Sequence, residues 1–349
     1  MKRVKKPTSI RLGKTYIRTN GLGLGCCFDN PKDDPEEIIK VAYEMGVRYF
    51  DTAPVYKSEV YIGNLIKNNV IDRSKIYIST KTKDISVDGI NKSISESCRQ
   101  LNTDYIDILW LHSGIDSSVQ YKMFKDNVLY LKDLLNVKYI GISGHDYKAA
   151  EAAIKDNLVD AIMVPHNILY RDFEDLIKVA KFNSIGVVTF KNFASGILIG
   201  GPENRFGVEM IKDLMNFEIM NDFSDIIIPS VRSVEQLRQI VKLFKEEDDG
   251  TDYDLLERYL KMKLGKVCVS CHKCRPCEKF GWEMSQPRIL KLLTYYTRFH
   301  LKEAKEEYKK IKLNIKDCAD AGCYNCFNEC PQFIDIVQWM YNANTLMGE

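Results

Sequence analysis

Eight short segments rich in apolar and β-branched residues recur between residue 22 and about residue 247, separated by longer segments with helical periodicity. Such alternation is typical of strand-helix units that build a parallel sheet, and strands covered on both faces are expected to be almost wholly apolar. Eight units over about 225 residues fit a closed (β/α)8 TIM barrel, so an α/β fold is predicted. The expected strands are residues 22–25, 48–50, 76–80, 106–111, 139–142, 161–164, 187–190 and 225–228.

An open, doubly wound sheet is the structural alternative, and the glycine-rich segment at residues 21–25 tests it. A dinucleotide fingerprint requires glycines on a tight turn that leads directly into a helix. Here Cys26 and Cys27 follow the glycines, and about ten residues pass before Pro35 can open a helix at residues 35–44. The phosphate-binding geometry is therefore absent, and the closed barrel is favoured. A later helix is expected at residues 233–244, with Ser233 as its N-cap.

The eleven cysteines are unevenly distributed: three precede residue 268, and eight lie between Cys268 and Cys330. We therefore expect a barrel in residues 1–250 and a small, mostly helical domain in residues 251–349. A connecting helix at about residues 250–267 should open the second domain, and a highly charged helix at about residues 288–312 should separate its two cysteine runs. The charged helix is interpreted as a solvated surface, with a basic docking surface as the less favoured alternative.

The two runs have the spacing of cluster ligands. Zinc sites prefer two separated Cys-x-x-Cys pairs, whereas several cysteines on one tight loop ending in Cys-Pro match ferredoxin segments. Iron-sulfur clusters are favoured over zinc, and zinc stays an alternative. The candidate ligands are Cys268, Cys271, Cys274 and Cys277 in the first run and Cys318, Cys323, Cys326 and Cys330 in the second.

Composition excludes several classes of function. Fifty basic and 48 acidic residues leave a net charge of +2, which provides no strong attraction for nucleic acid or anionic lipid. The sequence contains no run of about 18 apolar residues, so no membrane-spanning helix is expected. The basic start of the chain lacks the apolar stretch of a signal peptide, so a cytoplasmic protein with reduced thiols is expected.

Chemistry in a parallel barrel belongs to the carboxyl ends of the strands. Asp51 and Tyr56 follow the second expected strand, Lys81 follows the third and His112 follows the fourth. A tyrosine hydroxyl is a poor acid or base at neutral pH until a neighbouring ammonium, here Lys81, favours its anion. Asp51 can hold Lys81 charged, and a neutral His112 can orient a substrate oxygen. The set suits carbonyl reduction with hydride from a cofactor.

These residues lie in motifs that resemble the aldo-keto reductase family: YFDTAPVYKSE at residues 49–59, STK at 79–81, LHS at 111–113 and IGIS at 140–143. GVVTFKNFASGIL at 186–198 and IIIPSVRSVEQL at 226–237 are similar to the family's cofactor-binding loops. The resemblance implies a small carbonyl substrate, a NADPH or NADH cofactor, and Asp51, Tyr56, Lys81 and His112 as catalytic residues. The cofactor contacts that it implies are Ser143, Asn167, Lys191, Ser230, Arg232 and Arg238.

The sequence departs from the family pattern near the nucleotide. Met163 stands near the place of the family's glutamine, and Ser230 and Gln236 replace the lysine and arginine that usually bind the NADPH 2'-phosphate. Arg232 or Arg238 is the expected substitute, and NADPH is preferred over NADH by analogy alone. Cys26 and Cys27 are interpreted as packing residues rather than as catalytic thiols.

The cysteine-rich tail resembles the extension of a subgroup of aldo-keto reductases that carries ferredoxin-type 4Fe-4S motifs, although Glu278 replaces the proline expected after the first run. In ferredoxins the fourth cysteine of each run ligates the other run's cluster. We therefore expect Cys268, Cys271 and Cys274 to share one cluster with Cys330. The second cluster would use Cys318, Cys323, Cys326 and Cys277.

The leading hypothesis is an oxidoreductase that exchanges a hydride with the nicotinamide and passes single electrons through the two clusters, with a ferredoxin or another redox protein as partner. Two alternatives remain open. The clusters could have only a structural role, or the chain could be a redox-sensing subunit that binds the nucleotide without turnover.

Overall fold

The computed structural model describes residues 7–28, 30–112, 125–127, 136–248, 250–271, 273–274, 286–311 and 330–348. The chain divides into two compact units. The barrel unit comprises Met1–His166, Arg171–Asn192 and Lys212–Gly250. The C-terminal unit comprises Thr251–Glu349 together with two segments from within the barrel sequence, Asn167–Tyr170 and Phe193–Ile211.

Eight parallel strands form the sheet of the barrel unit, ordered β10-β9-β8-β7-β6-β5-β4-β3. The sheet closes because Ile227 N donates to Gly21 O and Gly25 N donates to Pro229 O, with a parallel bridge between Leu22 and Ile227. The barrel prediction is confirmed, and the open-sheet alternative is wrong. The strands are β3 Gly23–Gly25, β4 Tyr49–Asp51, β5 Tyr77–Thr82, β6 Ile106–His112, β7 Val137–Ser143, β8 Ala161–Pro165, β9 Gly186–Phe190 and β10 Ile226–Ile227.

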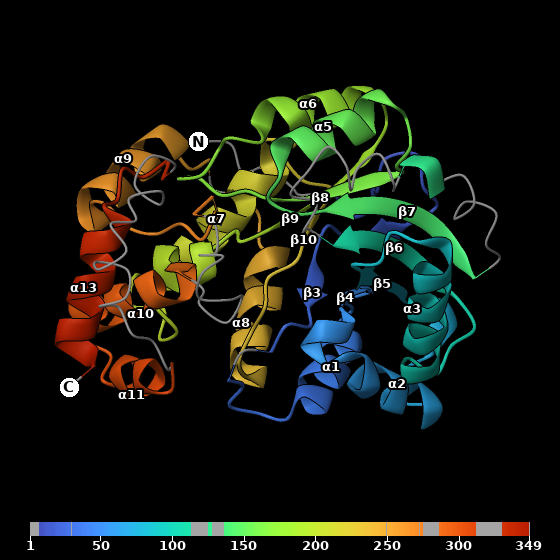
Figure 1. Ribbon diagram of the computed structural model, residues 1–349, viewed down its shortest axis with the longest axis horizontal. Helices are drawn as coiled ribbons and strands as arrows, with labels where there is room; N and C mark the ends of the chain where they lie inside the picture. The colour runs from blue at the N-terminus through green and yellow to red at the C-terminus, as the bar shows by residue number, and fades with distance from the viewer. Residues whose placement is uncertain are drawn as a thin grey trace. The chain divides into compact units, whose positions relative to one another are not determined.

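Helices cover the outside of these strands, as Figure 1 shows for α1, α2 and α3. The helix α1 begins where expected because Asp34 accepts a hydrogen bond from Glu36 N and Pro35 occupies the first turn. Ser233 caps α8 in the same way through Gln236 N. The helices after the strands are α1 Pro35–Glu44, α2 Glu59–Lys67, α3 Val87–Gln100, α5 Tyr147–Lys155, α6 Glu174–Phe182, α7 Val208–Met220 and α8 Val234–Lys245.

A short antiparallel hairpin precedes the barrel and was not predicted. Its strands are β1 Ile10–Arg11 and β2 Arg18–Thr19. Leu12 and Ile17 between them are buried in the core cluster that includes Tyr49 and Trp110. Leu12 packs so closely on the first residue of β9 that a Cβ on Gly186 would lie 2.5 Å from its side chain. The hairpin thus covers the amino ends of the strands, and the carboxyl ends remain for chemistry.

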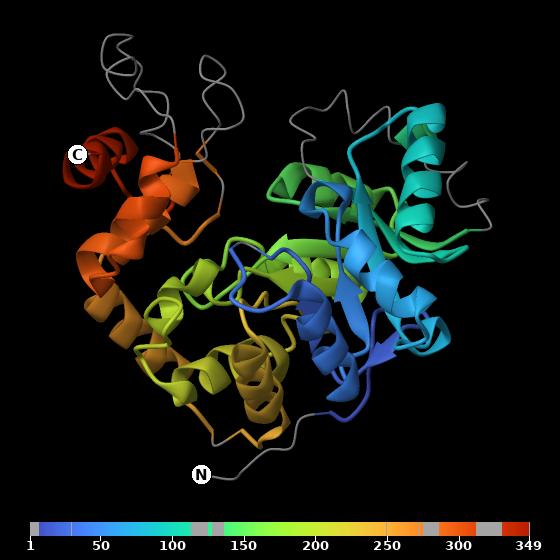
Figure 2. The ribbon, with the colours of Figure 1, turned by 90° about the horizontal axis from the view of Figure 1, so that it is seen from below.

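Four α-helices lie in the described part of Thr251–Glu349: α9 Tyr253–Leu264, α10 Gln286–Phe299, α11 Glu303–Lys309 and α13 Ile336–Met347. Figure 2 shows α10 and α13 side by side, and their apolar faces share one core with Cys268 and Cys274. The single charged helix expected at residues 288–312 is wrong. The chain breaks at His300, whose φ is 52°, and this turn brings Ala304 and Tyr308 of α11 into the same core.

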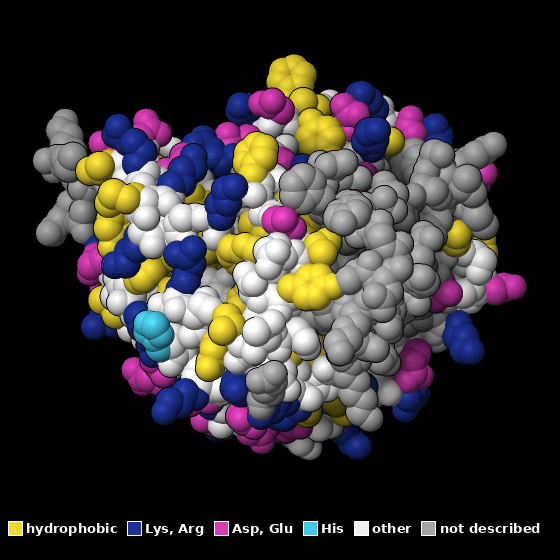
Figure 3. Space-filling view, turned by 60° about the vertical axis from the view of Figure 1, so that its left-hand side comes forward, with side chains coloured by type: hydrophobic (Ala, Val, Ile, Leu, Met, Phe, Trp, Pro, Cys, Tyr) yellow, Lys and Arg dark blue, Asp and Glu magenta, His cyan; other side chains and the backbone are white. Residues whose placement is uncertain are grey.

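None of the helices in the described ranges is both long and apolar enough to cross a membrane. On the face shown in Figure 3, lysine and arginine side chains are interspersed with aspartate and glutamate. This mixture agrees with the small net charge of +2.

Candidate functional site

A buried ion pair lies at the carboxyl ends of β4 and β5. Lys81 Nζ is 2.5 Å from Asp51 Oδ2 and also donates to Thr52 O at 2.8 Å. Ser79 Oγ donates to the other oxygen of Asp51 at 2.7 Å. Asp51 and Ser79 are register partners, and Lys81 lies two residues further along the same strand face. The ammonium of Lys81 is therefore held in one place by two groups at the end of the neighbouring strand, the Asp51 carboxylate and the Thr52 carbonyl, and Ser79 fixes that carboxylate from the strand of Lys81 itself.

Tyr56 and His112 complete the cluster that the sequence predicted. Tyr56 ends the short 3₁₀ helix Pro54–Tyr56 after β4, and its ring centre is 5.0 Å from Lys81 Nζ. His112 is the last residue of β6, and its ring meets the ring of Tyr56 edge to face at a centroid distance of 6.1 Å. Three consecutive strand ends thus bring all four side chains together.

The environment of the cluster fixes the protonation of two members. Burial and then the charges of Lys81 and Lys83 lower the pKa of His112 to about 3, so its imidazole is neutral at physiological pH. Burial, followed by the charges of Asp51 and Cys27, holds the pKa of Tyr56 well above its usual value. This direction is opposite to the one expected from Lys81, because burial disfavours the charged phenolate and the Asp51 carboxylate repels it. Tyr56 is therefore a protonated donor in the free protein.

A second buried contact secures the segment between β4 and α2. Glu59, the first residue of α2, accepts a hydrogen bond from Thr80 Oγ1 at 2.6 Å, and burial raises the pKa of its carboxyl group. Ser58 and Thr52 share a hydrogen bond of 2.7 Å. Since Thr80 directly precedes Lys81, these contacts hold the backbone on both sides of the tyrosine loop.

The expected nicotinamide residues lie at the ends of the next strands. Ser143 ends β7, and its Oγ contacts Met163 Sδ at 3.4 Å. Met163 is its register partner on β8, so the residue that replaces the family's glutamine does stand beside Ser143. Asn167 is buried after β8, and Lys191 follows β9 with a left-handed φ of 63°. Asn167 belongs to the C-terminal unit, whereas Ser143 and Lys191 belong to the barrel unit.

The three candidates after β10 have different surroundings. Ser230 is exposed, and its Oγ lies only 2.7 Å from where a Cβ on Gly25 would stand, so that position requires glycine. Arg232 donates from Nε to Asn30 O at 2.9 Å, which directs its guanidinium toward the segment after β3. Arg238 is an exposed residue of α8.

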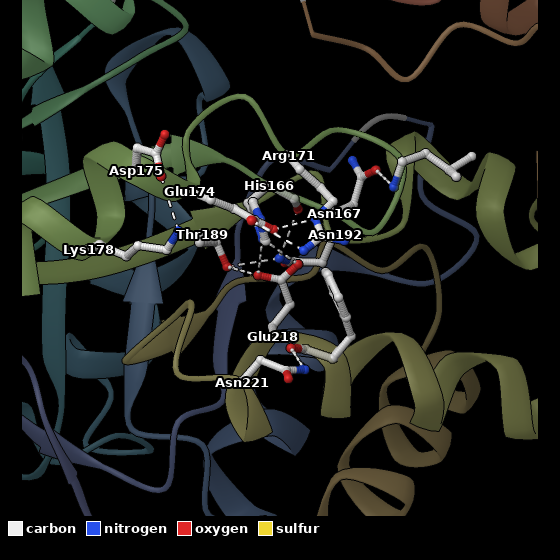
Figure 4. Close-up of polar contacts among 12 residues, drawn as sticks. His166, Asn167, Arg171, Glu174, Asp175, Lys178, Thr189, Asn192, Glu218 and Asn221 are labelled. Carbon is white, nitrogen blue, oxygen red and sulfur yellow. Dashed lines mark hydrogen bonds and ion pairs between the residues drawn. The ribbon is translucent and has the colours of Figure 1, made fainter. Parts of the chain in front are cut away.

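Sequence reasoning missed a buried polar network at the end of β8 (Figure 4). His166 Nδ1 lies 2.9 Å from Glu218 Oε2, and its Nε2 lies 3.4 Å from Glu174 Oε1. Thr189 Oγ1 donates to the same Glu218 carboxylate, and Asn192 Nδ2 donates to Thr189. Burial lowers the pKa of His166, but the two carboxylates outweigh it and raise the pKa to about 9.

This network had one usable signal in the sequence. Glu218 stands between Phe217 and Ile219 on an otherwise apolar segment of α7, and a carboxylate in such a place is rarely buried without a partner. The partner could not be identified from the sequence, because His166 is separated from Glu218 by 52 residues.

Four cysteines surround one pocket in the C-terminal unit: Cys268, Cys271, Cys274 and Cys330. The first three are buried, and Ser270 between them adopts a left-handed φ of 57°, which curls their loop. Burial and then the neighbouring Cys268 and Cys271 raise the pKa of Cys274. The four thiols come from both runs, as the crossed arrangement expects for its first cluster.

The other four expected ligands, Cys277, Cys318, Cys323 and Cys326, lie outside the described residues. All seven cysteines within the described ranges are free thiols. Among the described residues, no group of three or more His, Cys, Asp or Glu side chains could hold a metal ion.

Comparison with known proteins yields matches along the barrel. A model described as the aldo/keto reductase family matches residues 21–210, more than half of the chain. The chain is 29% identical over 247 residues to Aldo-keto reductase AFTS1 of Alternaria alternata, which covers 56% of this chain and 67% of that protein. It is 29% identical over 163 residues to Methylglyoxal reductase DkgB of Salmonella typhi, which covers 45% of this chain and 61% of that protein. The chain thus spans about two thirds of these relatives or less.

Solved structures share the fold. The holo form of aldo-keto reductase AKR11C1 from Bacillus halodurans matches with a TM-score of 0.61 at 22% identity, covering 72% of this chain and 96% of that chain. An aldo/keto reductase from Brucella melitensis matches with a TM-score of 0.60 at 20% identity, covering 72% of this chain and 98% of that chain.

Proposed function

The chain belongs to the aldo-keto reductase family of NAD(P)H-dependent oxidoreductases, and from that premise we propose that it reduces a carbonyl group with hydride from the nucleotide and carries iron-sulfur clusters in its C-terminal unit. The observation that carries the proposal is the cluster of Asp51, Tyr56, Lys81 and His112 at three consecutive strand ends. A small carbonyl compound is the proposed substrate.

Each of the four residues has a defined role in this reaction. The bound nicotinamide supplies the hydride to the carbonyl carbon. Tyr56, which is protonated in the free protein, donates its proton to the carbonyl oxygen, so an alcohol forms. Neutral His112 donates a hydrogen bond that orients the same oxygen. The pair of Lys81 and Asp51 lies beside the ring of Tyr56, with Lys81 Nζ 5.0 Å from the ring centre, and holds that side chain in place.

We propose NADPH as the preferred cofactor, with NADH as the alternative. Ser143 and Asn167 are suited to the carboxamide of the nicotinamide, and Lys191, Ser230, Arg232 and Arg238 to the phosphates. Support comes from their positions after strands β7 to β10, since ligands of a parallel barrel bind at the carboxyl ends of its strands. The contact between Ser143 and Met163 indicates that the amide pocket is less polar than the family pattern.

The four thiols around the pocket support an iron-sulfur cluster held by Cys268, Cys271, Cys274 and Cys330. A tetrahedral zinc site brings all its sulfurs within about 2.3 Å of one point. A cubane carries one iron at each of four corners and therefore holds its ligand sulfurs farther apart. Among the described residues, four cysteines drawn from both runs line one pocket, and four thiolates are the ligand set that a 4Fe-4S cluster takes. Cys277, Cys318, Cys323 and Cys326 would hold the second.

Clusters of this type exchange single electrons. We therefore propose a ferredoxin or another one-electron protein as redox partner, in the reducing conditions of the cytoplasm. The alternative to electron transfer is that the clusters only stabilise the structure of the C-terminal unit. A redox-sensing subunit without turnover is a second candidate function, which the apolar Met163 beside Ser143 favours.

Anaerobic purification followed by iron and sulfide analysis tests the clusters, and titration with NADPH tests the reductase. Two 4Fe-4S clusters require about eight iron and eight sulfide per chain. Zinc in place of iron would overturn the clusters, and a protein that binds neither NADPH nor NADH would overturn the reductase. Nucleotide binding without reduction of any carbonyl compound would favour the sensor.

A further inference from the structure

Two loops that follow barrel strands group with the C-terminal unit. Asn167–Tyr170 follows β8, and Phe193–Ile211 follows β9. Each loop adjoins a proposed nucleotide contact: Asn167 opens the first loop, and Lys191 lies two residues before the second. The contacts that attach these loops to the C-terminal unit therefore bear on nucleotide binding.

The first loop is a compact turn held by Gln332. Asn167 N donates to Tyr170 O, and Tyr170 N donates back to Asn167 O at 2.8 Å. Asn167 Oδ1 also accepts from Leu169 N at 3.1 Å, so the turn is fixed from both its backbone and its side chain. Gln332 Nε2 donates to Leu169 O at 3.2 Å. A displacement of Gln332 would consequently be transmitted to Asn167.

Gln332 is also part of the cysteine pocket. It lines the pocket together with Cys330, which lies two residues earlier in the chain. From the other run, Lys273 lies between two pocket cysteines and places its ammonium 5.8 Å from the centre of the Tyr170 ring. The same turn is thus contacted from both cysteine runs.

The second loop is strained and is held by Tyr295. Ala194 and Ser195 have left-handed φ values of 45° and 56°, which cost free energy for residues other than glycine and persist only with outside support. Tyr295 Oη supplies such support by donating to Ser195 O at 2.6 Å. The approach is so close that a Cβ on Gly196 would lie 2.7 Å from this hydroxyl. Tyr295 belongs to α10, which also lines the cysteine pocket through Leu290.

We infer that Gln332 and Tyr295 are positioning residues through which the occupied cysteine pocket increases the affinity for the nicotinamide nucleotide. This inference rests on the proposed clusters and cofactor. A cluster fixes the cysteine loops when it binds, because site formation and folding are coupled. Gln332 and α10 then hold both nucleotide loops in their binding conformation, so less ordering remains for the nucleotide to induce.

The direct test measures NADPH affinity by fluorescence in cluster-loaded protein. Gln332→Met keeps the length of the side chain but removes the amide donor, and Tyr295→Phe removes only the hydroxyl. Loss of one neutral hydrogen bond should weaken NADPH binding about fivefold in each variant. Iron and sulfide content should match the wild type in both loaded variants. For Tyr295→Phe, which does not line the pocket, the electron paramagnetic resonance spectrum of the reduced clusters, kcat at saturating NADPH and the KM for the carbonyl substrate should also stay at wild-type values.

Matched controls separate this effect from general damage. Gln338→Met changes a glutamine of α13 that bonds Asn342 on the exposed side, and Tyr296→Phe removes the hydroxyl of the adjacent residue on α10. Both controls should bind NADPH like the wild type. Wild-type protein stripped of iron should bind NADPH about tenfold more weakly, because both loops lose their support.

The outcomes distinguish the inference from the proposed function beneath it. Loaded Gln332→Met and Tyr295→Phe proteins with unchanged NADPH affinity would overturn the inference alone. A wild-type protein that takes up no iron would overturn the proposed clusters and the inference together. The comparison among loaded proteins holds even where the stripped protein fails to fold.

Discussion

Tyr56 is the residue on which the proposed chemistry depends most directly. It is half-buried, lies beside Lys81 and His112, and keeps its proton at neutral pH. Tyr56→Phe removes the donor without changing the shape of the loop. We expect kcat to fall by about a thousandfold, within the range of general acid catalysis, while the Kd for NADPH stays within about twofold. Steady-state kinetics and a fluorescence titration measure both.

The neighbouring Tyr61→Phe substitution on α2 is the control and should retain wild-type kinetics. A Tyr56→Phe protein that reduces any carbonyl substrate at near wild-type rates would remove Tyr56 from the catalytic set.

The pair of Asp51 and Lys81 makes a prediction about stability. Both side chains are buried, so removing one leaves the other without its countercharge, at a cost of about 3 kcal/mol. Asp51→Asn and Lys81→Met should each lower the free energy of unfolding by about this amount. The double variant should lose clearly less than the sum of the two. Urea denaturation measures all three.

The exposed ion pair of Glu96 and Arg99 provides the comparison, and Glu96→Gln should leave stability nearly unchanged. Additive losses from Asp51→Asn and Lys81→Met would mean that the buried pair is not coupled.

The sequence predicted that Asp51, Tyr56, Lys81 and His112 lie together, because each lies next to the end of an apolar strand that is itself recognisable. The protonation of Tyr56 was not predictable in the same way. It depends on how deeply the ring is buried and on how near the Asp51 carboxylate lies, and neither quantity can be read from the sequence. Burial then raises the pKa of Tyr56.

At the scale of elements, the strand positions followed from apolar runs, whereas connections between elements did not. The network of His166 joins the end of β8 to Glu174 on α6 and Glu218 on α7. Nothing in local periodicity relates these three positions. Similarly, the break at His300 depends on the tertiary burial of Leu301 and Tyr308, while the charged segment itself has a continuous helical pattern.

The His166 network should make stability depend on pH. The folded pKa of about 9 exceeds the ordinary value near 6.5. Because the folded pKa is raised, the stabilisation is fully present below pH 6.5 and is lost as the pH rises through 9. The loss corresponds to about 3 kcal/mol over this window. Urea denaturation between pH 6 and pH 10 measures it.

His166→Gln has no titrating group at this position, and its free energy of unfolding should be flatter over the same window. Equal slopes for the wild type and the variant would show that the imidazole is not held charged by Glu218 and Glu174.

For the whole molecule, the uneven distribution of cysteines indicated a separate C-terminal part. It could not indicate that Asn167–Tyr170 and Phe193–Ile211 group with that part, because both segments belong to the barrel pattern in sequence. Their attachment includes hydrogen bonds from single side chains, Gln332 and Tyr295, which carry no signal by residue type or spacing.

The crossed arrangement of the cysteine runs leads to the last prediction. Cys330 lines the pocket of Cys268, so both should serve one cluster. Cys268→Ser and Cys330→Ser should each damage that cluster, and the double variant should lose no more iron than either single variant. Cys326→Ser combined with Cys330→Ser should instead damage both clusters and lose about twice as much iron, because the two cysteines then belong to different sites. Cys98→Ser on α3 should lose none. Additive iron loss in the pair Cys268 and Cys330, with none added in the pair Cys326 and Cys330, would mean that each run closes on its own cluster.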